Sequence, residues 1–301
     1  MAGVDLLVVS PHFDDAVLSC AGRMHAAVTS GRRVHVATVM SGPSTAQAER
    51  QREDRRALAS LGVEASTLGL LDAPFRHGFY RDFESIVLRT HSADGAFGAA
   101  VSQALVDLCG QLQPAEIVLP LGVGTHIDHR WVHGSWPRLA ECASVLFYED
   151  RPYAFVEGFL RLRLHQLDTR IVGDPPTDLA PLPWATLRRA MLHDLRNTHF
   201  VRTYLPPGRQ RLRCALELTR QLRRVGMARP AVEPSLVLCP EVHRGDLREL
   251  DAVVDAVARY GTQLRDLFGD CDGIRRAYGR HASRLDPEAV HAERYWRLVL
   301  E

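Results

Sequence analysis

The sequence contains no lysine. All 37 basic residues are arginine, and with 36 acidic residues they leave a formal net charge of +1. Schiff-base chemistry and a P-loop phosphate site both need a lysine, so both are excluded. A charge so close to zero also argues against a broad surface for nucleic acid or membrane. The composition therefore argues against these two kinds of partner, and it does not indicate the oligomeric state.

Paired cysteines and long apolar runs are missing too. The six cysteines are scattered with no CxxC pair, which argues against a disulfide framework and a structural zinc knuckle. No apolar run approaches the ~20 residues that span a bilayer. Residues 1–10 include an acidic side chain and lead into an apolar, strand-like run, so we expect no signal peptide. Together with reduced thiols, these absences predict a cytoplasmic protein.

Alternating apolar and amphipathic stretches fill the first half of the chain. The short apolar runs are typical of strands buried on both faces, and the stretches between them have helical spacing. Strands separated by helices of this length predict a Rossmann-like α/β fold, in which a parallel sheet is flanked by helices. The expected strands are 6–10, 34–40, 66–71, 116–121 and 145–148, and the expected helices are 14–30, 47–61 and 99–112.

The alternation weakens after about residue 152. We expect a single domain over 1–301, in which a Rossmann-like core of 1–150 is followed by a C-terminal elaboration, 151–301, with substrate-side helices. The segment 77–98 is expected to be a loop or lid over the site. The second half is expected to contain a loop at 173–183 and helices at 188–198, 212–225, 246–268 and 287–298.

Two segments rich in histidine and aspartate carry the chemistry. Ser-Pro-His-Phe-Asp-Asp, residues 10–15, follows the first strand, and Gly-Thr-His-Ile-Asp-His, residues 124–129, follows the fourth. If the strand order is 3-2-1-4-5, both segments open into one crevice where the order reverses. Imidazole and carboxylate groups suit zinc, and a catalytic site needs three of them and an open position. The candidates are His12, Asp14, Asp15, His126, Asp128 and His129.

Taken one at a time, these residues have simpler interpretations. Asp14 is well suited to cap the helix that follows it, and His12 alone is more typical of a structural histidine. Their joint occurrence at two strand ends favours a metal site. The other histidines, His77 and His91 among them, are expected to be structural, and only His133, one turn after His129, is a candidate neighbour of the ligands.

Ser-Pro-His-Phe-Asp-Asp-Ala-Val-Leu-Ser with the later His-Ile-Asp-His resembles the zinc-dependent N-deacetylases related to the GPI-anchor N-acetylglucosaminyl deacetylase, the PIG-L or LmbE-like family. The resemblance extends to residues 52–55, 148–153 and 291–296. It implies that His12, Asp15 and His129 hold one zinc ion, and that Asp14 is the general base acting on water at the metal. The implied reaction hydrolyses an N-acyl amide, usually the N-acetyl group of a 2-acetamido sugar.

The resemblance also implies two further roles. A protonated His126 would stabilise the oxyanion, and Asp128 would orient His126. Whether Asp14 or His126 protonates the leaving amine is left open. Three departures from the family pattern stand out: Phe13 replaces the usual proline, Ala16 the usual glutamate, as in a branch that acts on glycosylated natural products, and Gly124 a tyrosine of some members.

Substrate contacts are less clearly marked in the sequence. Arg55, with Arg52 on the same helix, is a candidate to bind a sugar hydroxyl or a charged group, although a solvated helix face is an equal interpretation. Glu149 follows the fifth strand on the same edge of the sheet, and the turn 72–76 follows the third.

Three alternatives stay open. An amidase acting on a thiol conjugate would use the same residues. A Rossmann-like nucleotide-binding protein would need a glycine-rich turn after the first strand, where this chain has the carboxylate-rich segment 11–15. A protein that holds the metal without catalysis would have no use for Asp14.

Overall fold

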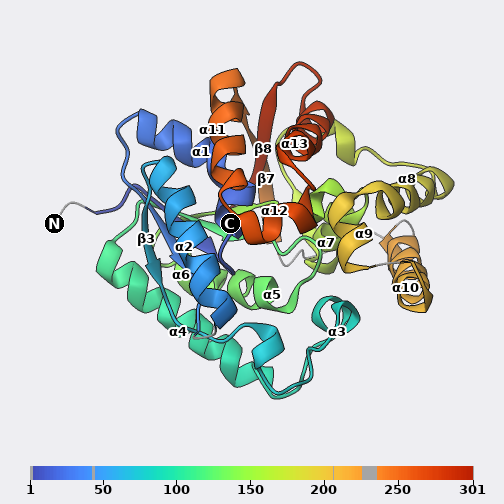
Figure 1. Cartoon of the computed structure of the whole chain (residues 1–301), viewed down its shortest axis with the longest axis horizontal. Helices are drawn as coiled ribbons and strands as arrows, with labels where there is room; N and C mark the ends of the chain where they lie inside the picture. The colour runs from blue at the N-terminus through green and yellow to red at the C-terminus, as the bar shows by residue number, and fades with distance from the viewer. Residues whose placement is uncertain (1–2, 43–44, 206, 226–235, 301) are drawn as a thin grey trace.

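A single eight-stranded sheet runs through the computed structural model, which describes residues 3–42, 45–205, 207–225 and 236–300 (Figure 1). Its strand order is β3-β2-β1-β4-β5-β8-β7-β6. The first five strands are parallel, β8 is antiparallel to both of its neighbours, and β6 is parallel to β7. The strands are β1 (Leu6–Ser10), β2 (Val34–Thr38), β3 (Glu64–Thr67), β4 (Glu116–Pro120), β5 (Ser144–Tyr148), β6 (Thr169–Ile171), β7 (Leu236–Gly245) and β8 (His291–Leu298).

Helices cover both faces of this sheet (Figure 1). One face is covered by α1 (Asp15–Thr29), α2 (Thr45–Ser60), α11 (Leu247–Ala258), α12 (Gly261–Leu267) and α13 (Cys271–Leu285). The other is covered by α4 (Asp94–Leu112), α5 (Ile127–His133), α6 (Trp136–Leu139), α7 (Phe159–Gln166), α8 (Trp184–Asn197), α9 (His199–Tyr204) and α10 (Arg209–Val225). The remaining elements are α3 (Phe83–Leu88) and three short 3₁₀ turns, η1 (Ala73–Phe75), η2 (Tyr153–Phe155) and η3 (Thr177–Leu179).

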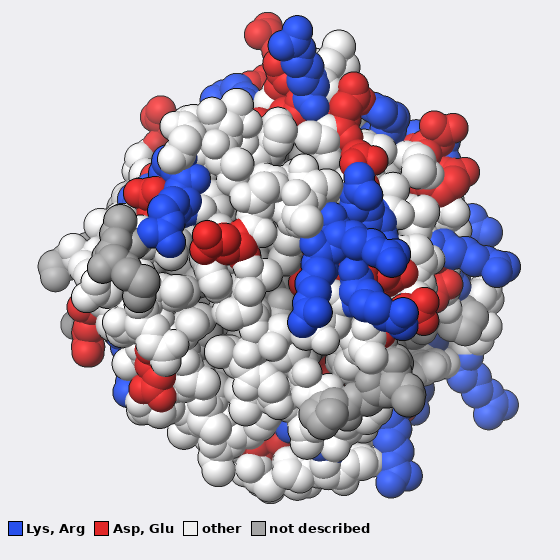
Figure 2. All heavy atoms as spheres, turned by 60° about the vertical axis from the view of Figure 1, so that its left-hand side comes forward, with Lys and Arg blue, Asp and Glu red and all other residues white. Residues whose placement is uncertain are grey.

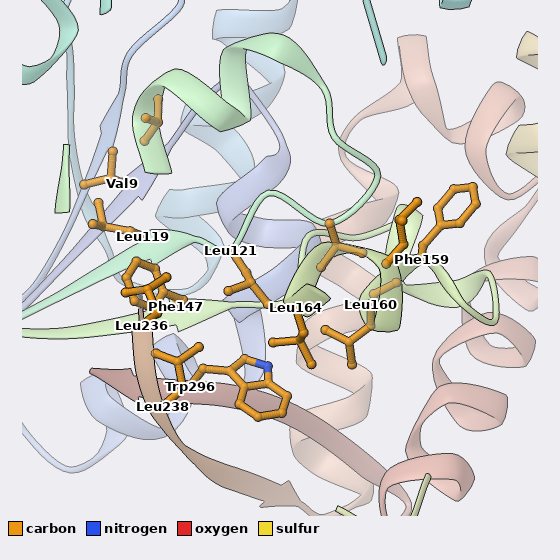
Figure 3. Close-up of a cluster of buried hydrophobic side chains, with 14 of the residues drawn as sticks. Val9, Leu119, Leu121, Phe147, Phe159, Leu160, Leu164, Leu236, Leu238 and Trp296 are labelled. Atoms are coloured by element: carbon orange, nitrogen blue, oxygen red, sulfur yellow. The ribbon is translucent and has the colours of Figure 1, made fainter. Parts of the chain in front are cut away.

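The two layers explain why the central strands are continuously apolar. Successive side chains of a strand point to opposite faces. In β1, Leu6 and Val8 therefore join the core beneath α1, and Leu7 and Val9 join the core beneath α4, and all four are fully buried. Figure 3 shows the second of these cores, where Val9 lies near Leu119 and Phe147.

The fold class and the strand order expected for the first half are confirmed. The third strand is displaced: β3 is Glu64–Thr67, two residues before the expected start. It lies at the edge of the sheet and is mostly exposed, so this strand can consist of polar residues. The expected strand was placed instead on the apolar run that follows it.

The second half differs more from expectation. Residues 287–298 were expected to form a helix, but His291–Leu298 is the strand β8. Polar residues of this strand are buried because they have partners: Glu293 lies 3.2 Å from His291, and Arg294 bonds Glu149 at 2.5 Å. The polar side chains therefore gave no sign of a strand buried on both faces.

Other expected elements need smaller corrections. The helix 246–268 is two helices, α11 and α12, because Tyr260 between them leaves the helical conformation with ψ of 63°. The loop expected over 77–98 contains α3 and the first residues of α4. The motif 124–129, which follows the fourth strand, contains the start of α5. The structure also contains elements that the sequence did not predict, namely α6, η2, α7, β6, α9, β7 and α13. The short turns η1 and η3 lie inside the expected turn 72–76 and the expected loop 173–183.

Charges are mixed on the surface. On the face drawn in Figure 2, arginines stand beside acidic side chains around a largely uncharged centre. No helix within the described ranges is long and apolar enough to cross a membrane.

Candidate active site

The turn from β1 to α1 has an unusual backbone at Asp14. Its φ is 111°, in the region that favours glycine, although the side chain is an aspartate. Asp14 stands at the helix N-cap, yet its carboxylate makes no capping bond, so the capping interpretation is wrong. No residue of the described part of the chain hydrogen-bonds to this carboxylate, which lines a pocket. Backbone strain of this kind is retained where it places a functional group.

Asp15, the next residue, is bonded in several ways. One oxygen, Oδ2, accepts a bond from the backbone N–H of His12 at 2.8 Å and lies 3.0 Å from its Nδ1. The same oxygen lies 3.2 Å from Nε2 of His129. One carboxylate therefore joins two histidines that are far apart in the sequence, as the adjacent strands β1 and β4 allow.

His129 is fixed on its other side by a second carboxylate. Asp150, after β5, lies 2.6 Å from Nδ1 of His129 and accepts bonds from the backbone N–H groups of Gly122 and Val123. A carboxylate on the far nitrogen of a ligating histidine fixes the ring and its tautomer. The sequence placed Asp150, with Glu149, after the fifth strand on the edge of the sheet that carries the site, but not as a partner of His129.

His126 precedes α5, and its Nδ1 accepts a 3.2 Å bond from the backbone N–H of Asp128. An imidazole that accepts at Nδ1 carries its proton on Nε2, so the hydrogen bonding assigns a neutral ring with an Nε2–H donor. Gly124 leaves room beside the site for the ring of Tyr153. A Cβ at Gly124 would collide with the ring of Tyr153, which packs at 5.9 Å against His129.

The carboxylate of Asp128 contacts His12 and not His126. It lies 3.1 Å from His12 Nε2 and accepts bonds from Ala73 N at 2.9 Å and from Arg76 Nη1 at 2.5 Å. Its link to His126 runs through the backbone. Arg76 is almost fully buried, and sequence reasoning missed its role, although it belongs to the turn that was marked as a candidate.

The buried charges shift the pKa values of these groups. Burial, followed by the neighbouring Asp15, raises the pKa of Asp14 well above its usual range. Burial would also raise the pKa of Asp15, but His129 and His12 outweigh it and the pKa falls below the usual range. Burial opposes protonation of His129, yet Asp15 and Asp150 raise its pKa to about 9. Burial and His12 lower the pKa of His126 well below its usual range.

A pocket of about 330 Å³ opens beside these residues. It is lined by charged groups that include Asp14, Asp72 and Arg50, and by aromatic rings such as Tyr153 and Phe200. A larger hollow of about 600 Å³ adjoins it at Leu267, which lines both.

Three sequence candidates lie elsewhere. Arg55 is exposed on α2 outside the pocket lining, where Arg50 of the same helix lies instead. Glu149 is buried against Arg294 and Trp296. His133 bonds the carbonyl of Pro120 and packs on Phe147, away from the other histidines.

The donor set fits a divalent metal ion. His12, His126 and His129, which we call the first histidine cluster, offer nitrogen atoms within 4.8 Å of one another, and Asp15 adds an oxygen beside two of these residues. Imidazole and carboxylate are the ligands of catalytic zinc sites, and Asp150 supplies the outer carboxylate that such sites use. The protons that now join the imidazoles to Asp15 occupy positions that a cation would take on binding.

At the ends of β1 and β4 the sheet thus carries a histidine and carboxylate set that could hold a divalent metal ion. Residues 7–136 match the PIG-L family, described as GlcNAc-PI de-N-acetylase, as the two motifs indicated. A 2'-N-acetylparomamine deacetylase of Streptomyces fradiae is 32% identical over 166 residues, 49% of this chain and 57% of that protein. A protein of the same name from Niallia circulans is 24% identical over 49% of this chain and 66% of that protein. The matches thus span less than two thirds of either relative.

Solved structures support the fold over the whole chain. A deacetylase of the teicoplanin biosynthesis pathway superposes with a TM-score of 0.66 at 20% identity and covers 98% of both chains. The A40926 pseudoaglycone deacetylase superposes with a TM-score of 0.63 at 19% identity, over 99% of this chain and 98% of that one. The C-terminal strands and helices therefore belong to the shared fold, beyond the segment that the family match covers.

Proposed function

We propose that this protein hydrolyses the N-acetyl group of an amino sugar carried by a larger metabolite, releasing acetate and a free amine. The observation that carries the proposal is the carboxylate of Asp14, which accepts no hydrogen bond from the residues that the structure describes and which a strained backbone holds in the pocket beside the histidines and Asp15. A protein that only stored a metal would not need a free base at this point.

One zinc ion would be held by His12, Asp15 and His129. When bound, it would polarise the acyl carbonyl and lower the pKa of a water molecule. The donor chemistry and the position of Asp150 support this assignment. His126 is also near enough to contribute a nitrogen, but its Nδ1 is engaged by the backbone of Asp128, which leaves an N–H for another purpose.

The protein side chains would then act in sequence. Asp14 accepts a proton from the attacking water as the new C–O bond forms at the acyl carbon. The Nε2–H of His126 donates a hydrogen bond to the developing oxyanion, and this bond is worth more in a buried site than in water. Asp14 returns its proton to the nitrogen as the C–N bond breaks. Asp128 holds His12 and the loop at Ala73 in place, rather than His126.

A sugar-bearing metabolite is favoured as the substrate for two reasons. The curated relatives are named for an acetylated aminoglycoside intermediate, and the structural neighbours for glycopeptide antibiotics. The pocket combines carboxylates, which can accept hydrogen bonds from sugar hydroxyls, with aromatic rings, and a second hollow shares its lining residue Leu267.

The test uses the purified chain loaded with zinc and three substrates: an N-acetylated aminoglycoside, an N-acetylglucosaminyl glycopeptide and an N-acetylated thiol conjugate. We expect mass spectrometry to detect loss of acetyl from one of the first two, with equal release of acetate. Asp14→Asn is the matched control for contaminating activity. Turnover of the thiol conjugate alone would favour the amidase alternative, and no turnover of any amide would contradict the proposal.

A further inference from the structure

A second cluster of histidine and carboxylate side chains lies between β3 and α4. His77 Nε2 is 3.0 Å from Asp94 Oδ1, and the rings of His77 and His91 stack with centroids 5.0 Å apart. Donor atoms of all three residues lie within 4.8 Å of one another. We propose that His77, His91 and Asp94, the second histidine cluster, bind a second divalent ion of the zinc type, which fixes the segment 77–94 beside the pocket.

The chemistry of the donors supports this site. Two imidazoles and one carboxylate leave a fourth position for water, which is the ligand count of a tetrahedral zinc site with one open place. Asp94 is fully buried, and the Tyr80 hydroxyl donates to its Oδ2 at 2.5 Å. This bond fixes the carboxylate and directs its other oxygen, Oδ1, towards His77.

An ion can also reach these donors. The His77 side chain is 38% exposed and His91 is half-buried, so the cluster is open on one side. Phe79 packs on the ring of His91 at 5.0 Å and shields another side. Binding through His77 Nε2 would replace its 3.0 Å hydrogen bond to Asp94, and binding through His91 Nδ1 would also cost the 3.2 Å bond from Ala93 N.

The site would stabilise residues that line the pocket. Asp82, Phe83, Ile86 and Val87 all lie between His77 and Asp94 and all line the 330 Å³ pocket. An ion that joins the two ends of this segment closes it into a loop. Like any cross-link, it thereby lowers the conformational entropy of the unfolded segment.

Arg76 connects the two clusters directly. Its Nη2 lies 3.6 Å from Asp94 Oδ2, and its Nη1 bonds Asp128, which in turn contacts His12. A cation bound to Asp94 would weaken the electrostatic attraction between that carboxylate and Arg76. The guanidinium would then interact mainly with Asp128. Loading of the second cluster is thereby coupled to the position of His12.

The first experiment counts metal ions. The full chain is stripped with a chelator, incubated with excess Zn²⁺, desalted and analysed by mass spectrometry for zinc per chain. We expect two ions in the wild type, one in His91→Gln, one in His12→Ala and none when both are changed. The exposed His165→Ala is the matched control and should keep two.

The variants also separate this inference from the proposed function. A single ion that survives His12→Ala and disappears in His91→Gln would support the second cluster while contradicting the first. A single ion lost in His12→Ala, or two ions retained in His91→Gln, would overturn the inference and leave His77 and Asp94 as an ordinary ion pair.

A second readout does not depend on stoichiometry. Trypsin cuts after arginine, and Arg81 and Arg89 are both exposed within the segment. Zinc should slow cleavage at these two sites by about tenfold in the wild type and in Asp14→Asn, but not in His91→Gln or Asp94→Asn. Equal cleavage rates with and without zinc in the wild type would contradict the proposed stabilisation.

Discussion

The two histidine clusters use the same side chains on different supports. His12 follows β1 and His129 lies on α5 after β4, so the first cluster rests on two adjacent strands of the sheet. His77 and His91 lie in the irregular connection between β3 and α4, and only Asp94 starts a long helix. Sites on rigid elements are held more accurately than sites on loops. The first cluster is therefore suited to catalysis, and the second to holding a segment in place.

The largest expected effect tests this difference in role. His129→Gln removes a nitrogen from the first cluster and leaves Asp15 and Asp150 without their shared partner. We expect acetate release to fall at least about 10³-fold, since metal ions supply several kcal/mol of transition-state stabilisation. The loss should exceed that of His91→Gln by at least tenfold, as measured by kcat/KM at saturating zinc. Similar losses in the two variants would erase the distinction between the clusters.

The second effect separates base from ligand within the first cluster. Asp14→Asn preserves the size of the side chain but removes its basic form. We expect kcat to fall by about 10²–10⁴-fold, the usual contribution of a general base, while zinc content stays unchanged. Because the carboxylate makes no capping bond, the free energy of unfolding should also be nearly unchanged. Near-normal turnover would mean that another group acts as the general base, and His126 is the first candidate.

The third effect concerns the connection between the clusters. Arg76→Met keeps much of the volume but leaves Asp128 and Asp94 buried without their cation. Outer contacts of this kind usually change metal affinity or activity by about 10–100-fold, and breaking a buried pair costs about 3–5 kcal/mol of stability. Chemical unfolding and kcat/KM measure the two effects.

A double variant sharpens this third test. Adding Asp94→Asn to Arg76→Met should restore part of the stability, because it removes one of the two unpaired charges. It should not restore activity, because Asp128 still lacks its partner. Recovery of both properties together would mean that Arg76 acts only through the fold.

The contrast between the clusters also explains what the sequence revealed. The residues of the first cluster stand in two compact motifs after apolar strands, so topology alone predicted that they meet. His77, His91 and Asp94 carry no such signal, because the connection that brings them together follows no hydrophobic period. Arg76 and Asp150 lie in segments that the sequence marked as candidates, but their roles were missed for the same reason: each acts through a long-range contact that depends on the path of a loop.

The C-terminal half was harder to predict because its polar residues are buried in pairs. In β8, Glu293 and Arg294 occupy positions that a binary pattern assigns to solvent, yet both are almost fully buried. Arg151 lies between these networks and bonds the carbonyl of Ala292. Partners that come from distant segments cannot be recognised from one strand alone.

The smallest effect contrasts two histidines of the same helix. Asp15 and Asp150 raise the pKa of His129 to about 9, whereas burial, with Arg163 nearby, lowers the pKa of His133 from 6.5 to about 3. His133 is thus neutral in the folded protein and protonated in the unfolded chain below about pH 6.5. Its contribution to stability is present above that pH and is lost as the pH falls towards 3. By linkage it should cost about 2 kcal/mol at pH 5 relative to pH 8.

His133→Asn tests this directly, because the asparagine amide can still donate to the carbonyl of Pro120 but does not titrate. The variant will be less stable than the wild type at pH 8, since it loses the ring packed on Phe147. Its free energy of unfolding, measured with urea, should nevertheless fall about 2 kcal/mol less than that of the wild type between pH 8 and pH 5. The exposed His165→Ala should follow the wild-type pH dependence. If stability falls equally with pH in His133→Asn and in the wild type, His133 can be protonated in the folded state. That result would place His133 among the charged groups around His129 and contradict the contrast between the two histidines.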